Sequence, residues 1–303
     1  MPPAVSVIIP AFNRAGPIVR AIQSVRAQTF QDLEVIVVDD GSTDQTDAVV
    51  QQIGDTRIRT IRHAHNLGAA EARNTGMKAA TGKYIAWLDS DDEWMCDKLQ
   101  IQLDALVLAA PDQKACYTAF ERIDLRNGTQ VYNPQAPDRK KLFMGCDLSP
   151  GSTLLFEREI LERIGYLDPG LNRYEDWDWL LRYCRDYRLL PVDQPLARIH
   201  FTPERSAKSV ETSAYKIVSK YSDELREFGA YRNIVISKRW MEVARYYAQE
   251  HNLAQVARYA AKGLATYPFQ PLEIWATLIK VWFGIKNGLL PSKIRTLVNG
   301  KRD

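Results

Sequence analysis

The feature that most constrains the fold of this chain is a regular alternation between short apolar runs and segments with helical patterning. The apolar runs are rich in Val and Ile and short, so they are interpreted as buried strands. These runs cover residues 5–10, 33–38, 57–62 and 84–88. The helical segments cover residues 17–28, a stretch that ends near Ile53, and residues 69–80. Because helices that connect parallel strands cover the faces of their sheet, this order predicts an α/β fold with a mixed, mainly parallel sheet flanked by helices.

Polar and acidic residues follow three of these predicted strands directly, in segments 10–14, 39–44 and 89–92. The carboxyl ends of parallel strands lie along one edge of a sheet, where open α/β proteins bind their ligands. The glycine-rich motifs that bind dinucleotides or form P-loops are absent from the sequence. A nucleotide diphosphate accompanied by a metal ion is therefore the ligand that this edge predicts.

The last of these segments holds three carboxylates, those of Asp89, Asp91 and Asp92. Carboxylates this close together repel one another, and a divalent cation relieves that repulsion. Mg²⁺ and Mn²⁺ prefer oxygen ligands, and Mg²⁺ typically takes one or two carboxylates together with water and phosphate oxygens. The alternative interpretation is a solvated loop in which Asp91 or Asp92 caps a helix that starts near Glu93.

The middle of the chain is less regular. Its predicted strands cover residues 115–123, 129–132, 151–156 and 196–201. A short helix is expected over residues 160–165 and a second one over residues 174–183. The second helix would carry Glu175 and Asp176 in its first turn, where acidic residues are electrostatically favoured. Helix capping is therefore one interpretation of this pair, and a catalytic role is the other.

Composition describes an ordinary soluble globular protein, with 303 residues, 46% apolar and 25% charged. Charge is uneven, because residues 210–303 hold 15 Lys and Arg against 8 Asp and Glu, and residues 1–209 hold 25 against 29. The four cysteines show no close pairing, so reduced thiols are expected. The chain starts without a signal-peptide pattern and has no apolar stretch of membrane-spanning length, so a cytoplasmic protein without a spanning helix is expected.

The last third of the chain is predicted to be helical. Segments 240–249 and 253–267 pair as an αα-hairpin in this interpretation, giving a domain over residues 1–210 and a helical C-terminal region over residues 211–303. Segment 274–286 is apolar and aromatic, and it is followed by Lys293, Arg295, Lys301 and Arg302. This pattern suits peripheral contact with an anionic membrane at its inner face. Packing on the hairpin, with a basic solvated tail, is an equally weighted alternative.

Five motifs together resemble family 2 glycosyltransferases of the GT-A fold, over about residues 4–210. Each motif is weak alone, but their order and spacing match the family. They are Pro10-Ala11-Phe12-Asn13-Arg14, Asp39-Asp40-Gly41-Ser42-Thr43-Asp44, Asn66-Leu67-Gly68 with Ala72-Arg73-Asn74-Thr75-Gly76, Asp89-Ser90-Asp91-Asp92 and Glu175-Asp176-Trp177.

The resemblance implies an enzyme that transfers a sugar from a nucleotide diphosphate donor, most often a UDP-sugar, with inversion at the anomeric carbon. The implied donor-binding residues are Pro10, Phe12, Asn13, Asp40, Arg73, Asp89, His200 and Arg205. Pro10, Phe12 and Asp40 would contact the base and ribose, with Phe12 in place of the more frequent tyrosine. His200 and Arg205 resemble the family's loop over the diphosphate.

Metal and catalytic roles are implied in the same way. Asp91 would be the principal ligand of Mn²⁺ or Mg²⁺, and Asp89 would assist at the ribose or the metal. Asp176 would be the general base that takes the proton of an acceptor hydroxyl, with Glu175 as the alternative. The acceptor would be a glycan or a lipid-linked sugar, and no nucleic acid partner is expected.

Processive members of the family carry a Q-x-x-R-W motif. Arg239 and Trp240 are present here, but Ile236 stands in place of the glutamine, which favours addition of a single sugar. Two other functions remain as alternatives. A nucleotidyltransferase would need a glycine-rich loop after the first strand, which residues 11–14 do not provide. A binding module without activity would have no need of the base carboxylate.

Overall fold

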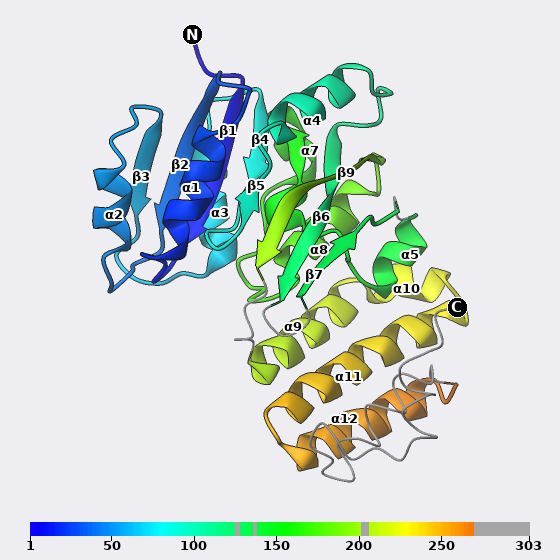
Figure 1. Cartoon of the computed structure of the whole chain (residues 1–303). Coiled ribbons are helices and arrows are strands. Elements are labelled where there is room, and N and C mark those ends of the chain that lie inside the picture. The colour runs from blue at the N-terminus through cyan, green and yellow to red at the C-terminus, as the bar shows by residue number, and fades with distance from the viewer. Residues whose placement is uncertain (125–127, 136–137, 201–205, 270–303) are drawn as a thin grey trace. The chain divides into compact units, whose positions relative to one another are not determined.

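The computed structural model describes residues 1–124, 128–135, 138–200 and 206–269 (Figure 1). The chain divides into two compact units, Met1–Pro203 and Glu204–Asp303. Arg205 and segment 274–286, which carry predictions made from the sequence, lie outside the described residues.

The first unit is built on a nine-stranded sheet in the order β3-β2-β1-β4-β8-β6-β9-β5, with β7 paired to β6. The strands are β1 (Val5–Ala11), β2 (Leu33–Asp39), β3 (Ile58–Arg62), β4 (Tyr84–Trp87), β5 (Glu93–Trp94), β6 (Ala115–Asp124), β7 (Gly128–Tyr132), β8 (Leu155–Glu157) and β9 (Leu189–His200). Strands β3, β2, β1 and β4 are parallel, as are β6 and β9, and the remaining pairs are antiparallel. The predicted mixed α/β class is confirmed.

Helices lie beside the strands of this sheet (Figure 1). They are α1 (Pro17–Arg26), α2 (Thr46–Gln52), α3 (Ala69–Ala79), α4 (Lys98–Val107), α5 (Arg139–Met144), α6 (Pro150–Thr153), the 3₁₀ turn η1 (Arg158–Ile160), α7 (Leu161–Ile164) and α8 (Glu175–Tyr183). The helices predicted over residues 17–28, 69–80 and 174–183 are present, with ends that differ by a few residues.

The two faces of the sheet follow the period-2 alternation of its strands. Val5, Val7 and Ile9 of β1 belong to one core cluster with the apolar sides of α1 and α4. Ile8 points to the opposite face, against which α3 packs. The packing is so close that a Cβ atom at Gly76 would lie 2.4 Å from Cγ2 of Ile8. A glycine in the middle of α3 weakens the helix, and the close approach of helix and strand explains its presence.

An aromatic cluster holds α8 against this second face. The ring centroid of Trp87 lies 5.3 Å from that of Phe156 and 5.5 Å from that of Trp179, in edge-on geometry. Each such pair contributes about 0.5–1.5 kcal/mol beyond the area it buries. Because Trp87 ends β4 and Trp179 lies in α8, the cluster fixes the first turn of α8 near the acidic loop that follows β4.

The strand predicted over residues 151–156 is partly wrong. Residues 150–153 form the short helix α6, and β8 starts only at Leu155. Pro150 occupies the first helical position, which its fixed φ favours, and the Thr153 hydroxyl donates to the carbonyl of Leu148 at 2.7 Å. The strand predicted over residues 196–201 is part of the much longer β9.

In the second unit, the described residues form four helices. These are α9 (Ala207–Lys220), α10 (Ser222–Glu227), α11 (Tyr231–Gln249) and α12 (Leu253–Thr266). The Asn252 side chain caps α12 by accepting from the backbone N–H of Gln255 at 3.2 Å. The two helices of the predicted hairpin, over residues 240–249 and 253–267, are therefore present, and the first of them starts earlier than predicted. In the part of the chain that is described, no helix combines the length and apolar character needed to cross a bilayer.

Candidate active site

The loops that follow β1, β2 and β4 meet at one edge of the sheet, as the sequence predicts. The three strands are parallel neighbours, with Ala11 opposite Asp39 and Ile8 opposite Trp87. The backbone N–H of Asp40 then donates to the carbonyl of Ala11 at 2.8 Å. The register of the sheet therefore places the predicted donor-binding loops side by side.

Asn13 ties the first of these loops to the second. It adopts a left-handed backbone conformation with φ of 52°. Its side-chain oxygen accepts from the backbone N–H of Thr43 at 2.8 Å, and its own N–H donates to the hydroxyl of Ser42 at 2.9 Å. Phe12 beside it is 40% exposed, whereas Pro10 is buried in β1. The ring of Phe12 is thus the accessible apolar surface of this loop.

Asp40 is buried and anchors the chain that leads into α3. Its carboxylate accepts from the backbone N–H groups of Leu67 and Gly68, both at 2.8 Å, and contacts Nδ1 of His63 at 2.7 Å. His63 Nε2 lies 2.9 Å from the hydroxyl of Thr75. Asp40 therefore shapes the loop over residues 65–68, and direct contact between its carboxylate and a nucleotide stays a prediction.

Arg73 joins the acidic loop after β4 to α8. Its Nη1 donates to Oε1 of Glu175 at 2.9 Å, and its Nη2 donates to Oδ1 of Asp89. Its guanidinium carbon lies 5.8 Å from the ring centroid of Trp87. Burial lowers the pKa of Arg73, but three surrounding carboxylates raise it by more, so that it lies above its ordinary value. These carboxylates belong to Asp89, Glu175 and Asp176.

Gly151 lies directly against the ion pair formed by Arg73 and Asp89. A Cβ atom at Gly151 would lie 2.5 Å from Oδ2 of Asp89 and 2.9 Å from Nη2 of Arg73. No L side chain fits there without displacing one of the two charged groups. Nothing in the local sequence distinguishes Gly151 from an ordinary glycine in a loop, so its close approach to Arg73 and Asp89 is visible only in the folded chain.

Ser152 holds the acidic loop from the same short helix. Its hydroxyl accepts from the backbone N–H of Asp89 at 3.1 Å and donates to Oδ2 of Asp92 at 2.5 Å. Oδ1 of Asp92 accepts from the backbone N–H of His200 at 2.8 Å. Burial first, and the charge of Asp89 next, raise the pKa of Asp92 well above its usual value. Asp92 is thus a structural residue that links the acidic loop to the end of β9.

The helix-capping alternative for the acidic loop is wrong. Residues Glu93–Trp94 form β5, and α4 begins at Lys98 with Asp97 at its N-cap. The predicted donor-site residue His200 ends β9, and its Nε2 lies 3.2 Å from Oε1 of Glu93. His200 therefore borders the acidic loop.

Glu175 and Asp176 open α8 after a residue with unusual backbone geometry. Tyr174, at the N-cap, has a φ of 67°, and a non-glycine residue in that region is held by its surroundings at a cost of about 1–3 kcal/mol. Burial, followed by the charge of Asp176, raises the pKa of Glu175, and Arg73 opposes this shift. Oδ1 of Asp176 accepts from the backbone N–H of Trp177 at 2.7 Å. Glu175 is thus hydrogen-bonded to Arg73, whereas the bond of Asp176 is to the backbone of Trp177.

The residues of the acidic loop fit a divalent cation that is shared with a diphosphate. Among the described residues, no three His, Cys, Asp or Glu side chains gather to hold a metal by themselves. Mg²⁺ usually needs only one or two carboxylates when phosphate oxygens complete its shell. Asp92 is excluded as a ligand by its bonds to Ser152 and His200. Asp91 and Asp89 remain as carboxylate ligands of the type that Mg²⁺ and Mn²⁺ prefer. The side chain of Asp89 is 38% exposed.

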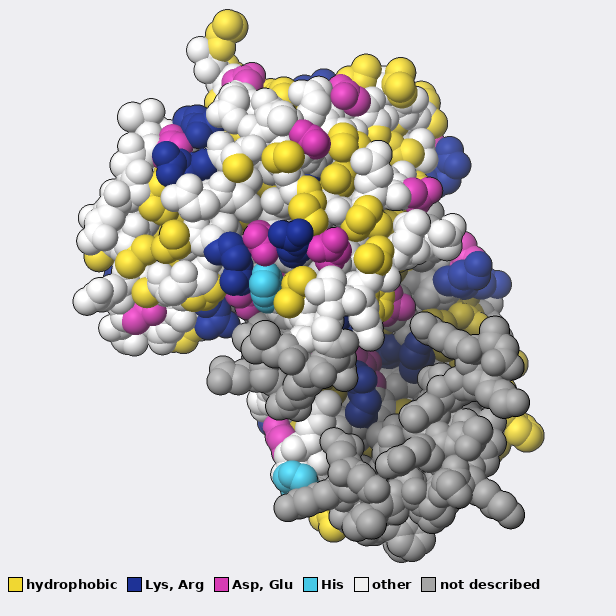
Figure 2. Space-filling model, in the orientation of Figure 1, with side chains coloured by type: hydrophobic (Ala, Val, Ile, Leu, Met, Phe, Trp, Pro, Cys, Tyr) yellow, Lys and Arg dark blue, Asp and Glu magenta, His cyan; other side chains and the backbone are white. Residues whose placement is uncertain are grey.

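Surface charge in the described part of the chain is mixed. In the centre of the view in Figure 2, Lys and Arg side chains lie directly beside Asp and Glu side chains, with a histidine next to them. Ion pairs such as Arg198–Glu121, at 2.8 Å, have the same mixed character. Opposite charges therefore compensate one another locally on this face.

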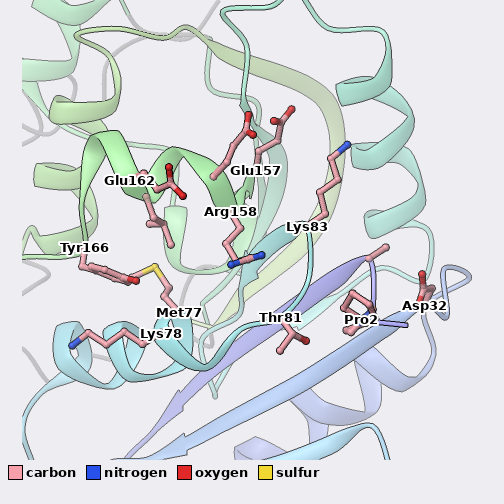
Figure 3. Close-up of a pocket in the computed structure, with 14 residues that line it drawn as sticks. Pro2, Asp32, Met77, Lys78, Thr81, Lys83, Glu157, Arg158, Glu162 and Tyr166 are labelled. Carbon is pink, nitrogen blue, oxygen red and sulfur yellow. The ribbon is translucent and has the colours of Figure 1, made fainter.

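A separate pocket of about 780 Å³ lies at the opposite edge of the sheet, where the parallel strands begin (Figure 3). Pro2, Thr81 and Lys83 precede strands β1 and β4, and the ring of Tyr166 is drawn beside the side chain of Met77. Its other lining residues are Pro3, Ala4, Asp32, Lys78, Glu157, Arg158, Glu159, Leu161 and Glu162. None of the residues predicted to bind donor, metal or acceptor lines it, so we place the candidate active site at the carboxyl edge.

Comparison with known proteins gives one family. The model of Glycosyl transferase family 2 matches residues 6–165. The Escherichia coli UDP-Glc:alpha-D-GlcNAc-diphosphoundecaprenol beta-1,3-glucosyltransferase WfaP is 43% identical over 229 residues, covering 74% of this chain and 86% of that protein. A second Escherichia coli enzyme with the same printed activity, WfgD, is 33% identical over 227 residues, with the same two coverages.

Solved structures show the same fold at low sequence identity. Staphylococcus aureus TarS 1–349 in complex with UDP has a TM-score of 0.58 and 18% identity, covering 95% of this chain and 93% of that one. Mannosyltransferase PcManGT from Pyrobaculum calidifontis, in complex with GDP-Man and Mn²⁺, has a TM-score of 0.59 and 22% identity, covering 93% of this chain and 87% of that one. Both likenesses concern the fold alone.

Proposed function

The chain belongs to glycosyl transferase family 2, and from that premise we propose that it moves one sugar from a UDP-sugar to a hydroxyl of a lipid-linked glycan, with inversion and with the help of Mn²⁺ or Mg²⁺. The observation that carries the proposal is the position of Arg73. The buried guanidinium group of Arg73 forms ion pairs with Asp89 of the acidic loop and with Glu175 of α8. Arg73 thus connects the loop that we assign to the donor with the helix that we assign to the acceptor.

On the donor side, the loops after β1 and β2 would receive the nucleoside. The exposed ring of Phe12 offers an apolar face for the base, and Asn13 keeps that loop in place through Thr43. Asp91 and Asp89 would hold the cation beside the diphosphate. When bound, the cation neutralises charge that develops on the departing diphosphate.

On the acceptor side, Asp176 is the better candidate for the general base. Its Oδ2 accepts no hydrogen bond from the described residues, whereas Glu175 is bound to Arg73. A carboxylate within hydrogen-bond reach of the acceptor hydroxyl takes its proton as the oxygen attacks the anomeric carbon. A single displacement from the face opposite the leaving diphosphate inverts that carbon.

The acceptor class is inferred from the relatives. The printed names of WfaP and WfgD describe transfer of glucose from UDP-glucose to a GlcNAc-diphosphoundecaprenol. We propose the same class of acceptor here, a sugar attached through a diphosphate to a lipid. This class fits an enzyme of cell-envelope polysaccharide synthesis that adds a single sugar.

Asp91→Ala is expected to lower metal-dependent hydrolysis of the donor by on the order of a hundredfold or more, since metal charge stabilisation is worth several kcal/mol. The measurement is release of sugar from a panel of UDP-, GDP- and dTDP-sugars with Mn²⁺, Mg²⁺ or EDTA. Asp104→Ala, which alters an exposed carboxylate of α4, serves as the control. Unchanged hydrolysis by Asp91→Ala would contradict the metal assignment. Nucleotide binding without turnover of any donor would indicate a binding module.

We also propose that the basic C-terminal residues contact anionic lipid. Replacing Lys293, Arg295, Lys301 and Arg302 by Gln in the full chain is expected to weaken binding to anionic vesicles by about tenfold or more, because each cation near such a surface contributes about 1 kcal/mol. Sedimentation with phosphatidylglycerol vesicles measures this, and neutral phosphatidylcholine vesicles are the control. Equal binding by both proteins to anionic vesicles would rule the contact out.

A further inference from the structure

Lys98 is the first residue of α4, and its side chain is fully buried. Its Nζ donates to Oε1 of Gln102 at 2.6 Å and lies 4.1 Å from the ring centroid of Trp94. Among the described residues, no carboxylate pairs with it. Burial lowers the pKa of Lys98 to about 7, and the neighbouring Cys116 opposes the shift. A buried lysine without an acidic partner is costly, so an apolar side chain would serve simple packing better.

The two partners of Lys98 both reach α6. Nε1 of Trp94 donates to the carbonyl of Ser152 at 2.7 Å. Nε2 of Gln102 donates to the carbonyl of Thr153 at 3.0 Å. Nζ of Lys98 thus contacts a ring and an amide, and each of these holds one of two consecutive residues of the same helix.

Ser152 connects α6 to the acidic loop through two hydrogen bonds. Its hydroxyl contacts the backbone N–H of Asp89 and the carboxylate of Asp92, so the residues on both sides of Asp91 are fixed from α6. The position of α6 therefore helps to set where the Asp91 carboxylate lies, together with Arg20 of α1, which donates to the carbonyl of Asp91. Because α6 is only four residues long, its position depends on contacts from outside.

We propose that Lys98 is a positioning residue. Through Trp94 and Gln102 it holds α6 in place, and α6 in turn holds the acidic loop in the position that binds the donor diphosphate and its cation. The proposal rests on the proposed function for its ligand. The position of the loop is a property of the protein alone and can be measured without any ligand. Groups that support metal ligands from behind typically change metal affinity or activity by about 10–100-fold when they are replaced.

Lys98→Met, which keeps a long unbranched side chain, is the first test. Hydrogen–deuterium exchange of the full chain without ligand is expected to be about tenfold faster in peptides covering residues 88–95 and 149–155. Calorimetric binding of UDP with Mn²⁺ is expected to weaken by about tenfold. Donor KM should rise by a similar factor, with a smaller change in kcat.

Two further variants separate positioning from stability. Trp94→Phe keeps a ring beside the ammonium group but removes the bond to Ser152, so it should raise donor KM as Lys98→Met does. The double variant Lys98→Met with Gln102→Leu removes both partners of the Lys98–Gln102 bond and also the bond from Gln102 to Thr153, so UDP affinity should not recover even where melting temperature does. Ser6→Ala, at the opposite edge of the sheet, removes buried hydrogen bonds and should leave UDP affinity unchanged.

The proposal is overturned if Lys98→Met and Trp94→Phe exchange deuterium in both peptides at the rate of the wild type, or if the double variant recovers both melting temperature and UDP affinity. Failure of the proposed function gives a different result. The wild type would then neither bind UDP with Mn²⁺ nor turn over a donor, while Lys98→Met would still exchange faster at residues 149–155.

Discussion

Asp176→Asn is expected to lower kcat for sugar transfer by about 10²–10⁴-fold, the usual contribution of a general base. Asparagine keeps the size of the side chain and its bond to the backbone N–H of Trp177 but cannot accept a proton. Binding of UDP with Mn²⁺ should therefore stay close to that of the wild type. Initial rates with a UDP-sugar and a lipid-linked acceptor, together with calorimetry of UDP binding, measure the two effects.

Glu175→Gln is the matched control, since it makes the same chemical change one residue earlier. Glu175 accepts from Arg73, and a glutamine oxygen can still accept there. Its effect on kcat should therefore be much smaller than that of Asp176→Asn. A large loss of kcat in Glu175→Gln with an active Asp176→Asn would reverse the assignment of the base to Glu175.

Arg73→Met is expected to cause a large loss of stability in the first unit. It removes a buried cation, with a side chain 6% exposed, from between Asp89 and Glu175. Breaking a buried ion pair on one side typically costs about 3–5 kcal/mol, and the partial exposure of Asp89 favours the lower end of that range. For a unit of this size, the melting temperature should fall by about 6–12 °C.

The same variant should also weaken donor binding, because Asp89 would lose the group that orients it. Calorimetric melting and UDP binding are the measurements. Arg163→Met is the control, because it breaks an ion pair with Asp186 that is exposed and contributes less than about 1 kcal/mol. A melting temperature for Arg73→Met equal to that of Arg163→Met would show that Arg73 does not hold the loop and α8 together.

The outline of the fold follows from local patterns in the sequence. The runs at residues 33–38 and 84–88 are apolar over a strand's length and end in polar residues, and these features alone predict buried parallel strands with a ligand edge. The strand predicted over residues 151–156 fails for a local reason as well. An apolar run beside Pro150 can continue a strand or follow a helical turn, and periodicity does not separate the two.

The chemical groups at the carboxyl edge, and the elements that carry them, can be predicted from the sequence, because each segment has its own pattern of apolar and polar residues. The pairing of these groups depends on the tertiary structure. Arg73 meets Glu175 across 102 residues, and Ser152 meets Asp92 across 60. Such pairs depend on strand order and helix packing, which bring distant residues together after the local elements have formed. The pairing of Glu175 with Arg73, which leads us to propose Asp176 as the base, is therefore a property of the folded chain.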